Sequence, residues 1–168
     1  NCVLADNAVV IDGSDVVLIP GLVDSHTHLP FAGTRQDEFR LKLQGVSYQE
    51  IAEKGGGIKA TVQQTREIDP NELIALCERR LDQILLSGTT TLEAKSGYGL
   101  DKESEIKQLE VISAVNSFHP IDLVPTFLGA HEIPEEFSGR NKEYLDFLIK
   151  QVMPRIKEKN LAEFTDIF

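Results

Sequence analysis

The sequence predicts an α/β fold with a parallel sheet, amounting to about the first half of a (β/α)8, TIM-like barrel. Apolar, β-branched segments alternate with amphipathic helical segments at a period of roughly 35 to 40 residues, which is typical of βαβ units. Histidine and tyrosine side chains follow the expected strand ends, where parallel barrels gather their active sites. An open doubly wound sheet also fits the alternation, but the placement of these polar side chains favours the barrel.

The sequence divides into two expected units. Residues 1–14 are interpreted as the tail of a small β-sandwich domain, and residues 15–168 as the barrel part. The run 15–24 is β-branched, apolar and bounded by charge, which predicts a buried strand. Residues 31–66 form an insertion-like excursion that could cover the site.

The rest of the chain continues the alternation. The helix expected over 69–88 has Asp69 as N-cap, Pro70 at its first position and Gly88 at its end. The helix expected over 101–118 is capped by Asp101 and places apolar residues on one face: Ile106, Leu109, Ile112 and Val115. The remaining expected elements are strands at 89–95, 121–130 and 164–168, and a helix at 141–160 that is bent or ended near Pro154.

Composition excludes some classes of function. The net charge is -10 and the pI about 4.8, so nucleic-acid binding has no electrostatic support. No apolar tract is long enough to span a membrane. Cys2 and Cys77 form no CxxC pair, which indicates free thiols in a reducing compartment and predicts a cytoplasmic protein. Met153 is the only methionine, so we expect the chain to be a piece of a longer protein.

His26 and His28 form the clearest candidate metal site. On an extended chain, residues two apart point to the same side. Two neutral imidazoles so placed can hold one divalent metal at about 2.0 to 2.1 Å each. Two histidines in a turn without a metal are the alternative. Their position at a strand end, after a Pro-Gly lead-in, favours the metal site.

Several stretches carry a resemblance to a known family. The run "PGLVDSHTHLPFAG" resembles the first-strand motif of the amidohydrolase superfamily, metal-dependent hydrolases built on a (β/α)8 barrel. The runs "HTHLPFAGTRQDEF", "GGGIKATVQQTRE", "GTTTLEAKSGYGL" and "TFLGAHEIPEEF" are similar to the imidazolonepropionase family within it. The resemblance extends from about residue 16 to the end of the chain.

This resemblance implies a reaction and a set of site residues. The reaction is hydrolysis of the cyclic amide of 4-imidazolone-5-propanoate to N-formimino-L-glutamate in histidine degradation, with one divalent metal, zinc or iron. The protein could also form a homodimer, a question that the sequence leaves open. The implied residues are His26 and His28 as metal ligands, Arg35, Tyr98, His131 and Tyr48 as substrate contacts, and His131 also as a catalytic group.

The chemistry of these side chains agrees with such a substrate. The planar fork of Arg35 can bind a carboxylate through two hydrogen bonds. Tyr98, between Gly97 and Gly99, can approach a ligand closely and offer its hydroxyl. His131 can hydrogen-bond or polarise a ring carbonyl or nitrogen.

Other functions remain in competition. A purine-type deaminase of the same superfamily would use the two histidines but has less need of Arg35. A non-catalytic binding barrel that keeps the motif without metal is the alternative from another class. Lys95 is interpreted as structural, and His119 as a partner of a helix C-terminus.

The sequence holds two metal ligands, against the three or four of a catalytic zinc site. We expect the remaining ligands beyond Phe168. The 168-residue chain alone is therefore expected to be inactive, and to expose strand edges and apolar surface.

Overall fold

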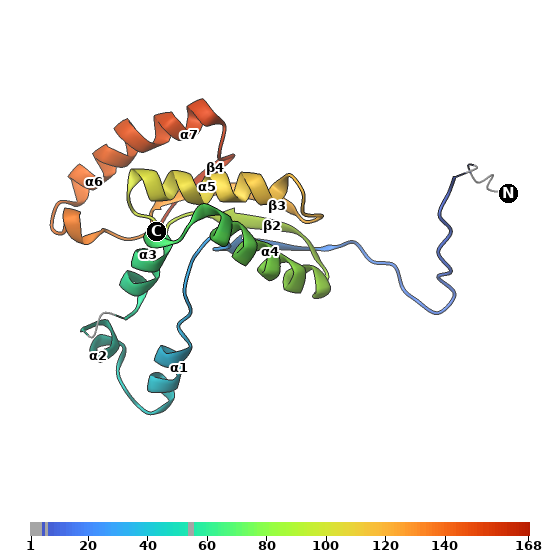
Figure 1. The fold of residues 1–168 in the computed structure, drawn as a ribbon, viewed down its shortest axis with the longest axis horizontal. Coiled ribbons are helices and arrows are strands. Elements are labelled where there is room, and N and C mark those ends of the chain that lie inside the picture. The colour runs from blue at the N-terminus through green and yellow to red at the C-terminus, as the bar shows by residue number, and fades with distance from the viewer. Residues whose placement is uncertain (1–4, 6, 54–55) are drawn as a thin grey trace.

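A curled, all-parallel sheet of four strands organises the computed structural model, which describes residues 5, 7–53 and 56–168 (Figure 1). Its order is β1-β2-β3-β4, so each strand pairs with the next one along the chain. The strands are β1 (Leu22–Thr27), β2 (Thr89–Lys95), β3 (Asp122–Ala130) and β4 (Phe164–Ile167). The predicted α/β class with a parallel sheet is confirmed.

Helices connect these strands. The helices of the strand connections are α4 (Pro70–Leu86), α5 (Lys102–Asn116), α6 (Asn141–Phe147) and α7 (Met153–Lys159). The excursion between β1 and α4 folds into α1 (Gln36–Leu43), α2 (Tyr48–Glu53) and α3 (Ile58–Glu67). Figure 1 shows α1 and α2 in a lobe away from the sheet.

Local capping explains where the long helices begin and end. The Asp69 carboxylate accepts a hydrogen bond from the backbone N–H of Asn71 (2.8 Å), and Asp101 accepts one from Ser104 (2.7 Å). Gly88 follows α4 with φ +93°, a conformation that glycine adopts without strain. Both predicted starts are confirmed.

The predicted helix 141–160 is interrupted but not ended. Residues Leu148–Val152 form a π-helical turn between α6 and α7, directly before Met153 and Pro154. Proline has no N–H to donate to the carbonyl four residues earlier. The wider π-helical turn therefore lies where the regular α-helical hydrogen bonds are interrupted. The chain then continues to Lys159 and turns at Asn160, which has φ 52°.

The first strand begins later than the sequence predicts. Residues 15–21 are not in a strand, and Val17 and Leu18 are 86% and 96% exposed. Pairing decides this boundary: the Leu22 N–H bonds to Gly88 O (2.9 Å), and Leu22 is in register with Thr89, the first residue of β2. The residues before Leu22 have no residues of β2 beside them with which to pair. Figure 1 shows the segment leading away from the sheet.

The predicted β-domain tail at 1–14 is not visible as a strand. Within residues 5 and 7–14, the structure shows a turn in which Ser14 N–H donates to Asp12 (3.0 Å) and assigns no strand. The tail therefore stays a prediction.

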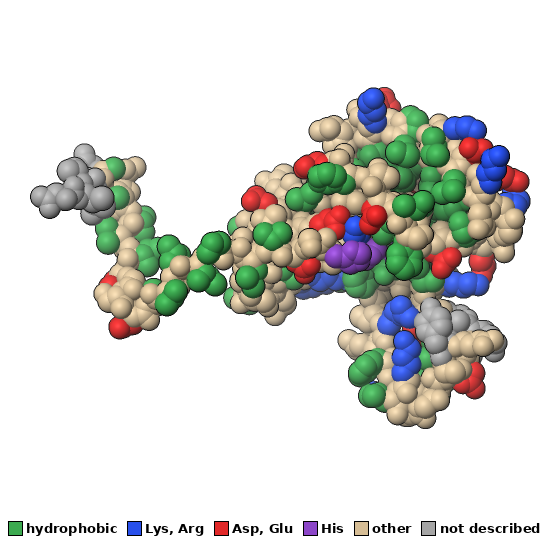
Figure 2. Space-filling model, turned by 180° about the vertical axis from the view of Figure 1, so that it is seen from behind, with side chains coloured by type: hydrophobic (Ala, Val, Ile, Leu, Met, Phe, Trp, Pro, Cys, Tyr) green, Lys and Arg blue, Asp and Glu red, His purple; other side chains and the backbone are tan. Residues whose placement is uncertain are grey.

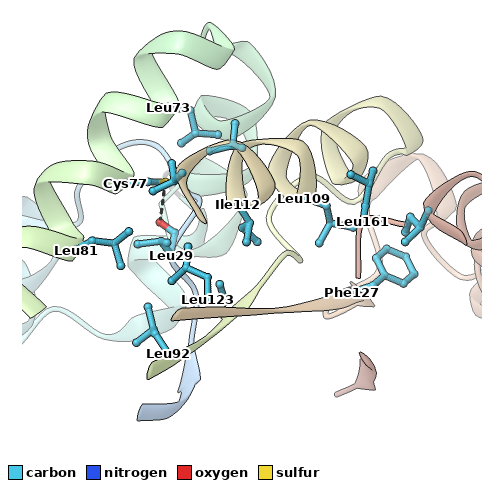
Figure 3. Packing of buried hydrophobic residues seen from close by; sticks show 14 of the residues in the cluster. Leu29, Leu73, Cys77, Leu81, Leu92, Leu109, Ile112, Leu123, Phe127 and Leu161 are labelled. Atoms are coloured by element: carbon cyan, nitrogen blue, oxygen red, sulfur yellow. Dashed lines mark hydrogen bonds between the residues drawn. The ribbon is translucent and has the colours of Figure 1, made fainter. Parts of the chain in front are cut away.

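The hydrophobic core lies between the helices and one face of the sheet (Figure 3). In β2, Leu92 and Ala94 are fully buried in it, while the alternate residues Glu93 and Lys95 point to the other face. Other members of the core are Leu73, Cys77 and Leu81 of α4, Leu109 and Ile112 of α5, and Leu123 and Phe127 of β3.

The buried face of α5 differs from the predicted one. Leu109, Ile112 and Val115 are buried as expected, but Ile106 is only partly buried. Glu105 and Gln108 are fully buried instead, because they face the loop after β2.

Cys77 is a free thiol, as predicted, and burial raises its pKa to about 12 although the nearby Arg80 acts in the opposite direction. Cys2 lies outside the described residues. Among the described residues, no helix has the length and apolar character needed to cross a membrane.

Leu81→Ala should lower the free energy of unfolding by about 2 to 5 kcal/mol, because Leu81 is fully buried in α4. Glu78→Ala, at an exposed position of the same helix, should change it by less than about 0.5 kcal/mol. Denaturant unfolding of both variants measures the difference. Equal losses would contradict the described core.

Candidate metal and substrate site

Four aromatic rings meet at the carboxyl edge of the sheet. His26 lies in β1, His28 follows it, and Tyr98 and His131 come just after β2 and β3. The His28 ring centre is 5.8 Å from that of His26, 5.1 Å from Tyr98 and 4.7 Å from His131. The predicted gathering of these residues at one edge is confirmed, with His26 inside the strand. Figure 2 shows histidine side chains exposed on one face with acidic groups beside them.

The side chains of His26 and His28 could hold a metal ion. Their ring separation of 5.8 Å suits two imidazoles that share one ion at about 2.0 to 2.1 Å from each nitrogen. His28 Nδ1 is buried and has no hydrogen-bond partner among the described residues. Burial, helped by His131 and His26, lowers the pKa of His28 to about 4. The ring is therefore neutral at neutral pH, as a metal ligand must be.

These histidines would form an incomplete site by themselves. Within the described part of the chain, no three or more His, Cys, Asp or Glu side chains are grouped so as to hold a metal. The role of His26 and His28 as metal ligands therefore stays a prediction.

Arg35 lies close enough to Tyr98 for its charge to act on that ring. It precedes α1, and its Nε contacts Glu38 (2.8 Å), whose carboxylate also accepts from the Gly57 N–H (2.8 Å). Burial raises the pKa of Tyr98, while the positive charge of Arg35 acts in the opposite direction. Tyr98 is therefore a neutral phenol beside a cation. Tyr48 begins α2, but its side chain lies outside the described part, so its substrate role stays a prediction.

One hydrogen bond defines the tautomer of His131. Its Nδ1 lies 2.8 Å from Gly97 O. A carbonyl oxygen can only accept, so the Nδ1 atom carries the proton. In the neutral ring, Nε2 then carries a lone pair and acts as an acceptor.

Lys95 and His119 keep to structural roles. The Lys95 ammonium contacts Asp166 (2.7 Å) and Glu93 (3.0 Å). Burial lowers its pKa, but these two carboxylates outweigh burial and raise it overall. His119 lies just beyond α5, where its N–H bonds to Val115 O and its Nδ1 accepts from Ile121 (3.2 Å).

Three residues that support the site escaped the sequence analysis. Arg80 Nη1 donates to Leu29 O and Phe31 O, each at 2.7 Å, directly after His26 and His28. Glu105 and Gln108 bind the loop that carries Tyr98. The sequence signals these three residues only weakly. Each is a polar residue in a helix, at a position that the apolar periodicity places near the core.

The fold and the site first define a class: an α/β protein whose polar and aromatic cluster lies where parallel-sheet enzymes place their sites. No family model matches the chain. The chain is 55% identical to curated imidazolonepropionases of Bacillus cytotoxicus and Bacillus cereus, and 54% identical to one of Bacillus thuringiensis. Each comparison covers 159 residues, which is 95% of this chain and 37% of the relative. The chain is thus related to imidazolonepropionases over most of its length, and spans little more than a third of theirs.

Gly97→Ala should destabilise the protein more than Gly139→Ala. Both glycines have positive φ, +109° and +72°, and alanine there costs roughly 1 to 2 kcal/mol. An added Cβ at Gly97 would also lie 2.8 Å from Leu128 O and 3.1 Å from His131 Cβ, whereas Gly139 has open space. Denaturant unfolding tests this, and equal losses would rule out the tight packing of Gly97 on His131.

Proposed function

We propose that the whole protein containing this chain is an imidazolonepropionase that hydrolyses 4-imidazolone-5-propanoate to N-formimino-L-glutamate. The observation that carries the proposal is 55% identity to curated imidazolonepropionases over 95% of the chain. The gathering of His26, His28, Tyr98 and His131 at one sheet edge supports it. The proposal places the reaction in the cytoplasm, since a free thiol such as Cys77 suits a reducing compartment.

The proposal includes a complete (β/α)8 barrel. The curled sheet has apolar residues exposed on both outer strands: Leu22 and Val23 of β1 are 53% and 68% exposed, and Phe164 and Ile167 of β4 are 59% and 69% exposed. Further strands of a closed barrel would cover these side chains and pair both edges. The tail at 1–14 would belong to the small β domain.

His26 and His28 would hold the single zinc or iron ion. Such an ion, when bound, lowers the pKa of a water ligand and polarises a carbonyl group. The chain itself supplies a neutral imidazole for it, because burial keeps His28 unprotonated.

The remaining side chains suit the two ends of the substrate. Arg35 offers a fixed positive charge for the propionate, which an acidic protein of net charge -10 otherwise repels. A purine-like ring has no carboxylate for this cation. Neutral Tyr98 can donate a hydrogen bond, and Nε2 of His131 in the Nδ1–H tautomer can accept one from a ring N–H. The His131 tautomer thus favours contact with a ring nitrogen over its carbonyl oxygen.

The metal role is tested on the whole protein by elemental analysis together with product detection by mass spectrometry. The wild type should carry one zinc or iron and form N-formimino-L-glutamate. His28→Ala should lose both, since it removes a ligand. His119→Gln, which alters a histidine beyond α5 and away from the site, should keep both. A wild type without stoichiometric metal, or a metal-loaded His28→Ala, would refute the metal role.

Arg35→Ala should raise KM for the propionate substrate by roughly 10- to 100-fold, as expected for loss of a charge-assisted hydrogen bond. Arg35→Lys should recover only part, because lysine lacks the planar fork. Arg40→Ala, at an exposed position of α1, serves as a charge-matched control and should leave KM unchanged. Steady-state kinetics decides, and an unchanged KM for Arg35→Ala would remove this assignment.

A further inference from the structure

The loop of residues 97–100, which carries Tyr98, includes one residue in an unfavourable backbone conformation. Gly97 has φ +109° and Leu100 has φ +57°, which is disfavoured for a residue with a branched side chain. Such a loop persists only where its surroundings hold it. Its backbone N–H groups point towards α5.

The carboxylate of Glu105 binds this loop from within the core. It accepts hydrogen bonds from the N–H groups of Gly97 (3.1 Å), Gly99 (2.9 Å) and Leu100 (2.8 Å), and one from the hydroxyl of Ser96. Glu105 is completely buried. Burial raises the pKa of Glu105, while these hydrogen bonds act in the opposite direction. A carboxylate has about four acceptor positions, so these donors satisfy it. The proposed reaction does not use this carboxylate.

Gln108, one turn further along α5, joins this loop to the end of β1. Its Oε1 accepts from Tyr98 N–H (3.3 Å), and its Nε2 donates to Pro30 O (2.5 Å). Pro30 lies two residues after His28. A single buried amide therefore sets the metal-site segment against the Tyr98 loop.

These contacts extend to His131 through one peptide group. The C=O of Gly97 and the N–H of Tyr98 belong to the same planar peptide. Its N–H bonds to Gln108, and its C=O accepts the Nδ1 proton of His131 (2.8 Å). The preceding N–H, that of Gly97, bonds to Glu105. A rotation of this peptide would withdraw the acceptor that keeps the proton on Nδ1.

We propose that Glu105 and Gln108 are positioning residues that hold the Gly97–Tyr98 peptide and thereby fix the His131 tautomer that leaves Nε2 as the acceptor facing the substrate. The effect on catalysis rests on the proposed function, whereas the effect on the tautomer does not. A merely structural pair would alter stability alone. The two roles therefore differ in what a substitution changes.

The test uses Glu105→Gln in the whole protein. The glutamine amide would turn two N–H donors towards backbone N–H groups, so the loop should shift. Nitrogen-15 NMR of the neutral imidazole should show the Nδ1–H form of His131 in the wild type and a mixture of both tautomers in the variant. The His131 signals are assigned by their loss in His131→Asn. We expect kcat to fall roughly 10- to 100-fold, as for other residues that orient an active-site histidine, with KM changed less than about threefold.

Gln108→Met keeps the side-chain volume and removes both hydrogen bonds, so it tests the same role if Glu105→Gln does not fold. Two variants of α5 serve as controls. Glu110→Gln removes an exposed carboxylate that contacts Lys159, and Val115→Ala loosens the core away from the loop. Both should keep the wild-type tautomer and kcat.

The outcomes separate the two proposals. An Nδ1–H tautomer and an unchanged kcat in a folded Glu105→Gln or Gln108→Met protein would overturn the positioning role, whatever the loss of stability. A tautomer shift in Val115→Ala would overturn it as well, because general loosening would then suffice. A wild type that fails to open the imidazolone ring would refute the proposed function, while the tautomer measurement would still decide the positioning role.

Discussion

The backbone just beyond the strand ends must find hydrogen-bond partners that the sheet no longer provides. Segments 29–31 and 97–100 carry or flank the site residues, and a buried group left unpaired there would cost about 1 to 3 kcal/mol. Side chains of α4 and α5 meet this need: Arg80 binds the carbonyls of the first segment, Glu105 the N–H groups of the second, and Gln108 both. The helices that cover the sheet therefore also hold the site.

The electrostatics of the site follow from burial at this edge. Desolvation and neighbouring rings keep His28 neutral, which leaves the lone pair of one ring nitrogen for a cation. Lys95 stays charged because Glu93 and Asp166 surround it, and Arg35 pairs with Glu38 at the more exposed rim. The neutral imidazole of His28 thus lies near positively charged side chains, an arrangement that can serve a metal ion and a carboxylate substrate at the same edge.

Much of the fold could be predicted from local signals. The caps at Asp69 and Asp101 were found because an acidic side chain bonds to N–H groups two or three residues away. His131 was placed correctly because a parallel strand ends just before it. The start of β1 was missed, since apolar residues before Leu22 carry the same β-branched pattern but have no strand beside them.

By itself, the sequence determined the alternation of strands and helices, the helix caps and the order of the site residues, because each depends on neighbours within a few positions. Only the tertiary structure decided which buried polar groups hold the site, which tautomer His131 adopts and how far the pKa of His28 falls. Those properties arise from contacts between distant segments: the amide of Gln108 meets Pro30 across 78 residues. Such a contact leaves no periodicity in the sequence, because its geometry exists only once both segments have packed.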